Sequence, residues 1–190
     1  MPYTLRDLAW VLGRLEEHGI KGVIVGSTIV ELELRRREFV DDIDLFVKEP
    51  SPMLEEDKYT QIASEEKWGY SYTSLGTPKL VARTPRGSEV VVEFYENILD
   101  FYIPEEMLAR AGSKKIEGRT IKLLKLEDYI VLKAKAARET DVEDLRIIRE
   151  YVEERKLKVD EKALKQALEF LPEEDRSLAL SKLRETGFID

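Results

Sequence analysis

The chain has 190 residues, of which 43% are hydrophobic and 37% are charged, with a formal net charge of −8 and no cysteine. That length suffices for one large domain or for a domain with a helical extension, and the hydrophobic fraction is high enough for a packed core. The lack of cysteine excludes disulfides, thiolate catalysis and cysteine metal sites, and the negative charge argues against an extended nonspecific DNA-binding surface.

Asn occurs once and Gln twice, whereas Glu, Lys and Arg are abundant, and this composition is typical of proteins from thermophiles. No apolar stretch approaches the length of a membrane span, and the N-terminus lacks a basic-then-apolar export signal. We therefore expect a cytoplasmic protein from a thermophile, with no membrane partner.

The N-terminal part of the chain is expected to alternate helices and strands. Leucines recur at helical spacing after Thr4, a good N-cap residue, until Gly19 ends the pattern. Pro52 suits the first turn of a later helix. The predicted elements are helices over 5–19, 28–37 and 52–68 and strands over 21–25 and 39–47.

The next extended runs are separated by turns that contain Gly and Pro, which is typical of an antiparallel meander. We predict its strands at 70–74, 79–83 and 89–95. A helix that begins at Pro104 and a hairpin that turns at Glu117-Gly118 follow. The helix is expected to stop at Gly112, and the hairpin to cover 115–122.

From Leu126 onward the hydrophobic pattern is helical, in about four segments. Breaks are expected near Thr140, 156–160 and Pro172. The whole pattern predicts an α+β fold, in which a mixed β-sheet with flanking helices precedes a C-terminal helical subdomain. We place the α/β domain at residues 1–124 and the helical subdomain at 125–190.

Two carboxylates, Asp42 and Asp44, lie two residues apart within an apolar run. In a strand, alternate side chains point to the same face, so these two should emerge together, about 7 Å apart, while Ile43 and Leu45 point into the core. Because such carboxylates repel each other unless a cation lies between them, the pattern favours a divalent-metal site, with Mg²⁺ as the usual ion for hard oxygen ligands. Asp41 is interpreted as a residue at the strand entry.

Gly26-Ser27 lies where a short apolar strand gives way to an amphipathic segment. Free backbone N–H groups and the helix dipole at such a junction favour a phosphate. A Gly-Ser turn is common on its own, but together with the paired carboxylates it suggests a nucleoside triphosphate handled with a metal.

This combination resembles the nucleotidyltransferase superfamily typified by DNA polymerase beta, in which a hydrophobic–Gly–Ser turn precedes a D-x-D strand and a third acidic residue on a later strand. The resemblance implies that Gly26 and Ser27 bind the nucleotide phosphates and that Asp42 and Asp44 hold two Mg²⁺ ions, with Mn²⁺ as an alternative. The third metal-binding and catalytic carboxylate is then Glu93, in the sequence V-V-V-E-F-Y, where the family more often has Asp.

The choice of Glu93 has two competitors on the same predicted strand. Glu93 lies between two apolar residues, where a carboxylate without a partner is costly. Glu89 shares its face of the strand, and Glu96 lies at the strand end, so either is an alternative third ligand.

The segment K-A-K-A-A-R-E-T-D-V-E-D-L (133–145) resembles the helical Lys…Asp-x-x-Asp motif of the AbiEii-like branch, which includes toxin nucleotidyltransferases. It implies that Lys133 binds the nucleotide and that Asp141 and Asp144 orient it or the acceptor. If the helix is continuous, these three side chains fall within about 80° of one another. A salt-bridged helix face, with Asp141 at the start of a new segment, explains the pattern equally well.

Other catalytic classes lack support in the sequence. His18, the only histidine, lies near a predicted helix end, where a capping or solvent role is expected, and Ser27 has no histidine partner in its motif. One histidine without cysteine argues against a zinc site, and no Walker-type phosphate loop occurs.

The sequence therefore predicts a metal-dependent nucleotidyltransferase that moves a nucleoside monophosphate from an NTP to a hydroxyl of RNA, protein or a small molecule. The resemblance alone suggests transfer RNA or a partner protein as acceptor, within a toxin–antitoxin pair. The alternative class is a non-catalytic nucleotide- or metal-binding partner protein with a degenerate site, such as a regulatory or antitoxin-like subunit.

Overall fold

A computed structural model describes residues 2–98 and 101–190, which divide into two compact units. Unit 1 takes the described residues up to Tyr102 together with 112–123, and unit 2 takes 103–111 together with 124–190. The boundary before the C-terminal helices thus lies between residues 123 and 124, one residue before the predicted boundary between 124 and 125. The segment 103–111, which the sequence placed in the α/β domain, belongs to the helical unit.

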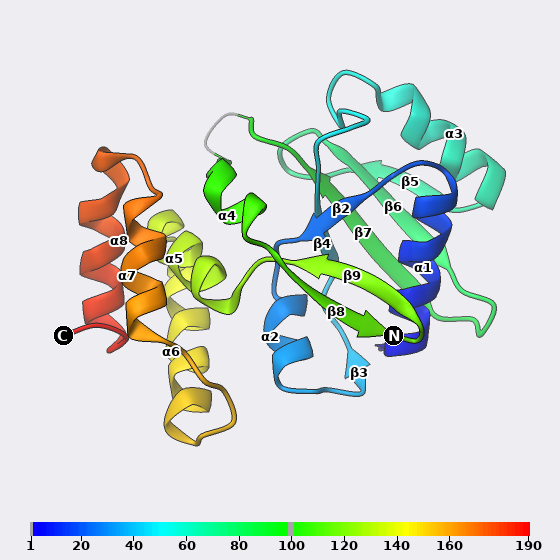
Figure 1. Cartoon of the computed structure of the whole chain (residues 1–190). Coiled ribbons are helices and arrows are strands. Elements are labelled where there is room, and N and C mark those ends of the chain that lie inside the picture. Colours follow the sequence, from blue (N-terminus) through cyan, green and yellow to red (C-terminus); the bar gives the residue numbers. More distant parts are fainter. Residues whose placement is uncertain (1, 99–100) are drawn as a thin grey trace. The chain divides into compact units, whose positions relative to one another are not determined.

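Unit 1 is built on a mixed β-sheet (Figure 1), as the sequence predicted. In the described part of the chain seven strands form this sheet, in the order β5-β6-β7-β4-β2-β9-β8. Their bounds are β2 Gly22–Ile24, β4 Ile43–Val47, β5 Gly69–Tyr72, β6 Pro78–Arg83, β7 Glu89–Tyr95, β8 Gly112–Ile116 and β9 Arg119–Leu123. The pairs β4–β7 and β2–β9 are parallel, and the other neighbours are antiparallel.

Two short strands and three helices complete unit 1. The strands β1 (Tyr3–Thr4) and β3 (Glu38–Phe39) pair with each other apart from the main sheet. The helices are α1 Leu5–Glu17, α2 Thr28–Glu33 and α3 Glu56–Glu66. Thr4 begins α1 as predicted, because its hydroxyl accepts from the Asp7 backbone N–H in a reciprocal capping box.

One face of the sheet carries the hydrophobic core of unit 1. Tyr59 of α3 packs edge-on against Phe94 of β7, with ring centroids 4.8 Å apart, so α3 covers the face to which Phe94 points. Val92, Ile43 and Leu45 are buried on the same face. Their neighbours in sequence point to the opposite face, where the candidate site lies.

Two predicted elements of unit 1 are shorter than expected. The strand predicted over 39–47 is divided into β3 and β4, and residues 40–42 form a connection between them. The helix predicted over 28–37 ends at Glu33, because Arg35 has a left-handed φ of 55° and the Lys114 ammonium binds the Leu32 carbonyl oxygen at 3.1 Å.

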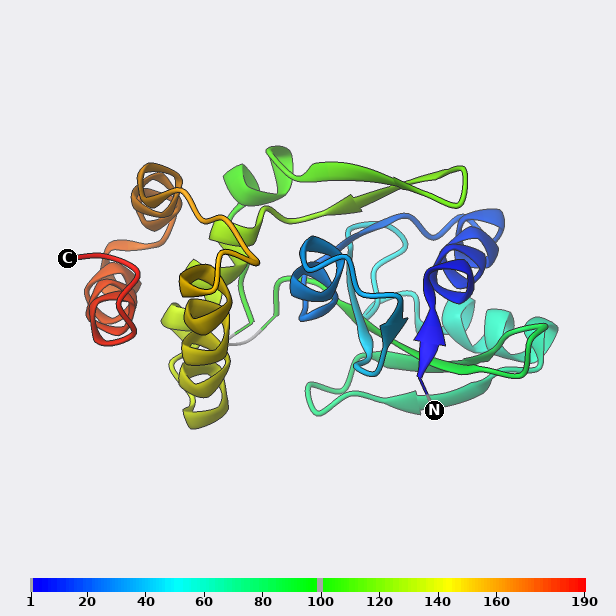
Figure 2. The same cartoon turned by 90° about the horizontal axis from the view of Figure 1, so that it is seen from below.

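The helix α3 starts later than predicted, and the β8–β9 hairpin is longer than predicted. The helix predicted from Pro52 begins at Glu56. The strands β8 and β9 form a hairpin (Figure 2), which turns at Glu117-Gly118 as predicted. β8 starts at Gly112, three residues before the predicted 115. Gly118 has a φ of 82°, which the turn requires and which glycine adopts without strain.

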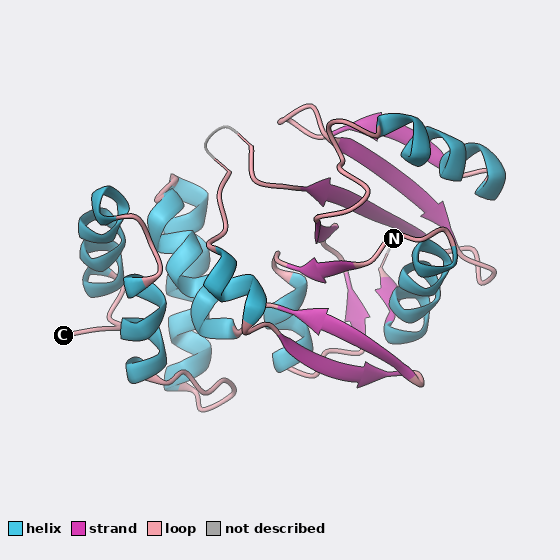
Figure 3. Ribbon diagram, turned by 45° about the horizontal axis from the view of Figure 1, so that its top comes forward, coloured by secondary structure: helices cyan, strands magenta, loops and turns pink. Residues whose placement is uncertain are grey.

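Unit 2 is helical, as predicted, and appears entirely in helices and loops in Figure 3. Its helices are α4 Glu105–Ala109, α5 Leu126–Ala136, α6 Glu139–Glu153, α7 Glu161–Glu169 and α8 Glu173–Glu185. The central helix α5 contacts α6, α7 and α8. The break expected near Thr140 occurs earlier, at Ala137 and Arg138, where Ala137 takes a left-handed φ of 51°. Of the helices that the structure describes, none has the length and apolar character needed to cross a membrane.

Candidate active site

Three charged side chains form a row across neighbouring strands of unit 1. Asp44 of β4 is in register with Glu93 of β7, and Glu93 is in register with Lys79 of β6. Residues in register on adjacent strands point to the same face, which here is the face opposite Phe94. The sheet therefore brings together two of the three predicted carboxylates and adds a lysine that the sequence analysis did not identify.

The third predicted carboxylate reaches the same row from the connection before β4. The Lys79 ammonium lies 3.1 Å from Oδ2 of Asp42 and 2.8 Å from Oε1 of Glu93. The side chains of Asp42 and Glu93 are 39% and 17% exposed, so solvent reaches the row. The hydrogen bond that Lys79 donates to Glu93 raises the pKa of Lys79. Partial burial lowers this pKa, and the hydrogen bond to Asp42 raises it again, so the net effect is a raised pKa and the side chain stays cationic.

Gly26 lies directly against the Asp44 carboxylate. A Cβ at position 26 would be 1.9 Å from Oδ2 of Asp44, so the close approach requires glycine. The neighbouring Ser27 hydroxyl donates to Oδ2 of Asp41 at 2.8 Å and makes no cap hydrogen bond to α2. The Gly-Ser turn and the carboxylates, which are separated in sequence, are thus in contact.

A tyrosine completes the surroundings of Glu93. The Tyr95 hydroxyl donates to Oε2 of Glu93, so both carboxylate oxygens of Glu93 have donors. The Tyr95 ring stacks on Phe101, with centroids 4.8 Å apart. Burial, followed by the hydrogen bond to Glu93, raises the pKa of Tyr95, which therefore keeps its proton and acts as a donor.

A signal for both missed residues is present in the sequence. Tyr95 is two residues beyond Glu93 in an extended run, so it shares its face. Lys79 and Glu93 are each seven residues from Arg86, the middle of the predicted turn between the two strands. An antiparallel pair folded about that turn has the register observed here, and the turn itself is closed by the Thr84 N–H bond to the Ser88 carbonyl at 2.9 Å.

The alternative third ligands have other partners. Glu89 is paired with Arg83 at 3.2 Å, further along the same strands and away from Asp44. Glu96 accepts a hydrogen bond from the Ser51 hydroxyl at 3.0 Å. Of the three carboxylates that the sequence left open, Glu93 is the one in register with Asp44.

Hydrogen bonds with two buried side chains, Tyr3 and Glu31, fix the connection that carries Asp41 and Asp42. The Tyr3 hydroxyl donates to the Asp41 carbonyl at 3.0 Å, and Glu31 of α2 accepts from the Val40 backbone N–H. Glu31 is 5% exposed, and burial, together with the nearby Asp41 charge, raises the pKa of its carboxyl. Asp41 is therefore more than a strand-entry residue, because its carbonyl accepts a hydrogen bond from Tyr3 and its carboxylate accepts one from Ser27.

The remaining nucleotide-binding candidates lie in unit 2 and bind one another. The Lys133 ammonium is 2.9 Å from Asp141 and 2.7 Å from Asp144, and it lies 5.7 Å from the centroid of the Tyr129 ring. Arg138 also pairs with Asp141, whose side chain is fully buried. Because Lys133 is on α5 and the two aspartates are on α6, the ion pairs join two helices and do not lie along a continuous one.

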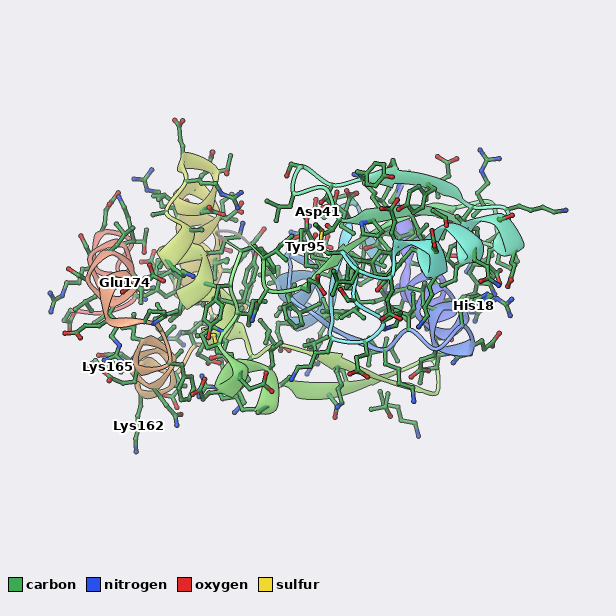
Figure 4. All side chains as sticks on the ribbon, turned by 90° about the horizontal axis from the view of Figure 1, so that it is seen from above. His18, Asp41, Tyr95, Lys162, Lys165 and Glu174 are labelled. Atoms are coloured by element: carbon green, nitrogen blue, oxygen red, sulfur yellow. The ribbon has the colours of Figure 1, made fainter. Side chains whose placement is uncertain are left out.

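His18 takes no part in the carboxylate row. It is the C-cap residue of α1, as its position suggested, and its Nε2 atom is 2.7 Å from Oε1 of Glu66. Figure 4 shows His18 well away from Asp41 and Tyr95 within unit 1. A histidine-dependent reaction at the row is therefore not supported.

The row supplies carboxylate oxygens, the ligands that hard divalent ions prefer. In residues 2–98 and 101–190 no three His, Cys, Asp or Glu side chains are grouped as a ready-made metal site. Lys79 lies between two of the carboxylates in question. Asp42 and Asp44 nevertheless fit Mg²⁺ or Mn²⁺ by chemistry, because they supply hard oxygen ligands, and the absence of a side chain at Gly26 lets the Asp44 carboxylate lie against the Gly-Ser turn.

Solved structures that are similar to this chain are known. One is an antigenic nucleotidyltransferase-like protein from Paracoccidioides brasiliensis, which has 16% sequence identity and a TM-score of 0.56 over 97% of this chain and 90% of that one. The antibiotic-resistance factor ANT(2'')-Ia has 15% identity and a TM-score of 0.46 over 97% and 92%. No curated protein matches the sequence.

The family assignment rests on nearly the whole chain. Residues 4–185 match the family described as "Nucleotidyl transferase of unknown function (DUF2204)". This range includes the Gly-Ser turn, the three carboxylates and the helices α4 to α8 of unit 2. The chain therefore belongs to this nucleotidyltransferase family.

Proposed function

We propose that this chain transfers a nucleoside monophosphate from an NTP to a hydroxyl group of RNA, a protein or a small molecule, and releases pyrophosphate in a reaction that depends on Mg²⁺ or Mn²⁺. The observation that carries this proposal is the contact between the Gly26-Ser27 turn and the row of carboxylates on one open face. A phosphate-binding turn beside hard oxygen ligands is the arrangement that nucleotidyl transfer needs.

Asp42 and Asp44 would hold the divalent ion, which when bound neutralises triphosphate charge and lowers the pKa of the attacking hydroxyl. The backbone N–H of Gly26 and the hydroxyl of Ser27 would bind the terminal phosphates. Ser27 already donates to Asp41, so it would exchange one oxygen acceptor for another. The proton of the acceptor hydroxyl would pass to Glu93.

The helical unit enters the proposal through the AbiEii-like resemblance. Lys133 would neutralise phosphate charge, and Asp141 and Asp144 would orient its ammonium, which they already bind. The contacts described above explain these residues equally well as the ion pairs that join α5 to α6. Their role with the nucleotide stays a prediction.

A second candidate function is a nucleotide- or metal-binding partner protein without catalytic activity. One observation favours it: Lys79 and Tyr95 already occupy both oxygens of Glu93, which limits its capacity to accept a proton. In that case NTP and metal would bind, but no monophosphate would be transferred.

The test is a thermal-shift titration with Mg²⁺ and each NTP, on the parent and on Asp44→Asn. The parent should melt at a higher temperature with Mg²⁺-NTP, by an amount that follows ligand concentration. Asp44→Asn should lose that shift, while without metal it should be as stable as the parent or more stable, because carboxylate repulsion is relieved. An equal shift in both proteins would contradict the proposed site.

A further inference from the structure

Lys79 is held among the carboxylates of the candidate site by the sheet itself. It is near the start of β6, in register with Glu93, and its ammonium contacts both Glu93 and Asp42. Glu93 is in register with Asp44 on its other side. The lysine is thus fixed by backbone pairing, and its side chain is only 27% exposed.

The charges of the row set how many cations it can take. Asp42, Asp44 and Glu93 carry three negative charges, and the Lys79 ammonium carries one positive charge, which leaves a net charge of −2. One divalent ion neutralises that remainder. A second divalent ion bound to Asp42 or Glu93 would lie next to an ammonium that is 3.1 Å from Oδ2 of Asp42 and 2.8 Å from Oε1 of Glu93, and the two cations would repel each other.

The hydrogen-bond donors around Glu93 also disfavour a second metal ion at this carboxylate. Tyr95 donates to one oxygen of Glu93 and Lys79 to the other, so metal ligation by Glu93 would require the loss of at least one of these hydrogen bonds. The Oδ2 atom of Asp42 accepts a hydrogen bond from the Lys79 ammonium. Asp44 is in register with Glu93 on the neighbouring strand, and its carboxylate lies directly against Gly26.

We propose that the Lys79 ammonium replaces one of the two divalent ions expected for this type of site, so that the chain binds a single ion at Asp42 and Asp44 while Lys79 holds Glu93. This inference rests on the proposed function for the identity of the site. It concerns the number of ions and the residue that limits it. Lys79 acts as a positioning residue, because it keeps Glu93 in place through an ion pair that needs no metal.

The test counts Mn²⁺ ions by electron paramagnetic resonance, with Mn²⁺ alone and with Mn²⁺ plus a non-hydrolysable NTP analogue. The proteins are the parent, Lys79→Met, Lys79→Arg and the control Arg83→Met. Arg83 lies on the same strand and pairs with Glu89 of the same neighbour, so its loss also removes an ion pair between β6 and β7. Melting curves in a chelator report whether each variant folds.

The parent and Arg83→Met should bind one Mn²⁺ per chain. Lys79→Met should bind a second ion, or the first roughly tenfold more tightly or better, because a positive charge next to the site has been removed. Lys79→Arg keeps that charge and should behave as the parent does. In chelator, Lys79→Met should melt below the parent and regain its stability with Mn²⁺, because the ion replaces the lost ammonium.

Two Mn²⁺ ions in the parent, or the same number and affinity in the parent and Lys79→Met, would overturn this inference and leave the proposed function intact. If Lys79→Met does not fold, Lys79→Gln, which keeps a hydrogen-bond donor without the charge, takes its place with the same expectations. Failure of the parent to bind Mn²⁺ either with or without the analogue would instead refute the proposed function, and this inference with it.

Discussion

At the scale of single residues, the contact between Gly26 and Asp44 holds the Gly-Ser turn against the carboxylates. A Cβ at position 26 would overlap Oδ2 of Asp44 and would also lie 2.8 Å from its Cβ atom, so the aspartate side chain would have to move as a whole. A displacement of about 1 Å in a group that positions the reacting atoms costs roughly a factor of 100 in rate.

Gly26→Ala should therefore lower nucleotidyl transfer about 100-fold while the protein remains folded. Gly112→Ala is the matched control, because the nearest atom to a Cβ there is the Leu123 carbonyl oxygen at 3.9 Å, an ordinary contact. Label transfer from NTP and circular dichroism melting measure the two effects. Full activity in Gly26→Ala would show that Asp44 does not need its present position.

A second prediction concerns Glu31, the buried carboxyl beneath residues 40–42. Its pKa is raised in the folded protein, chiefly by burial, and its Oε2 atom has no hydrogen-bond partner among the described residues. Because the folded chain holds this proton to higher pH than the unfolded chain does, the contribution of Glu31 to stability is most favourable at low pH and becomes less favourable as the pH rises from about 4.

Glu31→Gln should remove this pH-dependent loss, since the amide keeps an oxygen that can accept from the Val40 N–H. At pH 7 to 8 the variant should be more stable than the parent by about 1 kcal/mol, and the difference should shrink toward pH 4. Urea unfolding at several pH values measures it, with the exposed Glu38→Gln as control, expected to change stability by less than about 0.5 kcal/mol. A difference that does not vary with pH would refute the explanation by burial.

At the scale of elements, the break between α5 and α6 gives Lys133 its structural role. Ala137 turns the chain with a left-handed φ of 51°, and the two helices are then joined by Lys133 with Asp141 and Asp144. Asp141 is fully buried, and burial alone would raise its pKa, but the bonds from Arg138 and Lys133 lower it below its ordinary value. The cluster therefore keeps a buried charge compensated.

Lys133→Met should destabilise the protein by about 2 kcal/mol or more, because Asp141 loses one of its two cationic partners. The exposed pair Arg149–Glu153 on α6 provides the control, since Arg149→Met should cost less than about 0.5 kcal/mol. Chemical unfolding gives both values. Equal effects would contradict the structural role, and binding of Mg²⁺-NTP to folded Lys133→Met would show whether the residue also serves the nucleotide.

The elements also show which features a local pattern can predict. The strand β7 and the helix start at Thr4 follow from alternation and capping, which involve only neighbouring residues. The early end of α2 could not be predicted in this way, because the group that binds its last turn, Lys114, comes from a strand 81 residues away from Glu33. Tertiary contacts of this kind override local preference.

At the scale of the whole molecule, the sequence predicted the mixed sheet, the helical C-terminal part and the meeting of Asp44 with Glu93. Lys79 was not predicted, although it lies on a recognised strand, because its role depends on the register between β6 and β7. Tyr95 was not predicted either, although alternation along β7 places it on the face of Glu93. The segment 103–111 packs with unit 2, a long-range contact that a local pattern does not predict.

We propose that Asp44 belongs to a site that transfers a nucleoside monophosphate. This proposal is tested most directly by incubating the parent and Asp44→Asn with each NTP, labelled either at the α- or at the γ-phosphate, in the presence of Mg²⁺ and pools of cellular RNA, protein and small molecules. We predict that an acceptor gains the α-label in the parent only, with release of pyrophosphate. Transfer of the γ-label, equal transfer by Asp44→Asn, or no α-label in any pool by a parent that binds Mg²⁺-NTP would contradict the account.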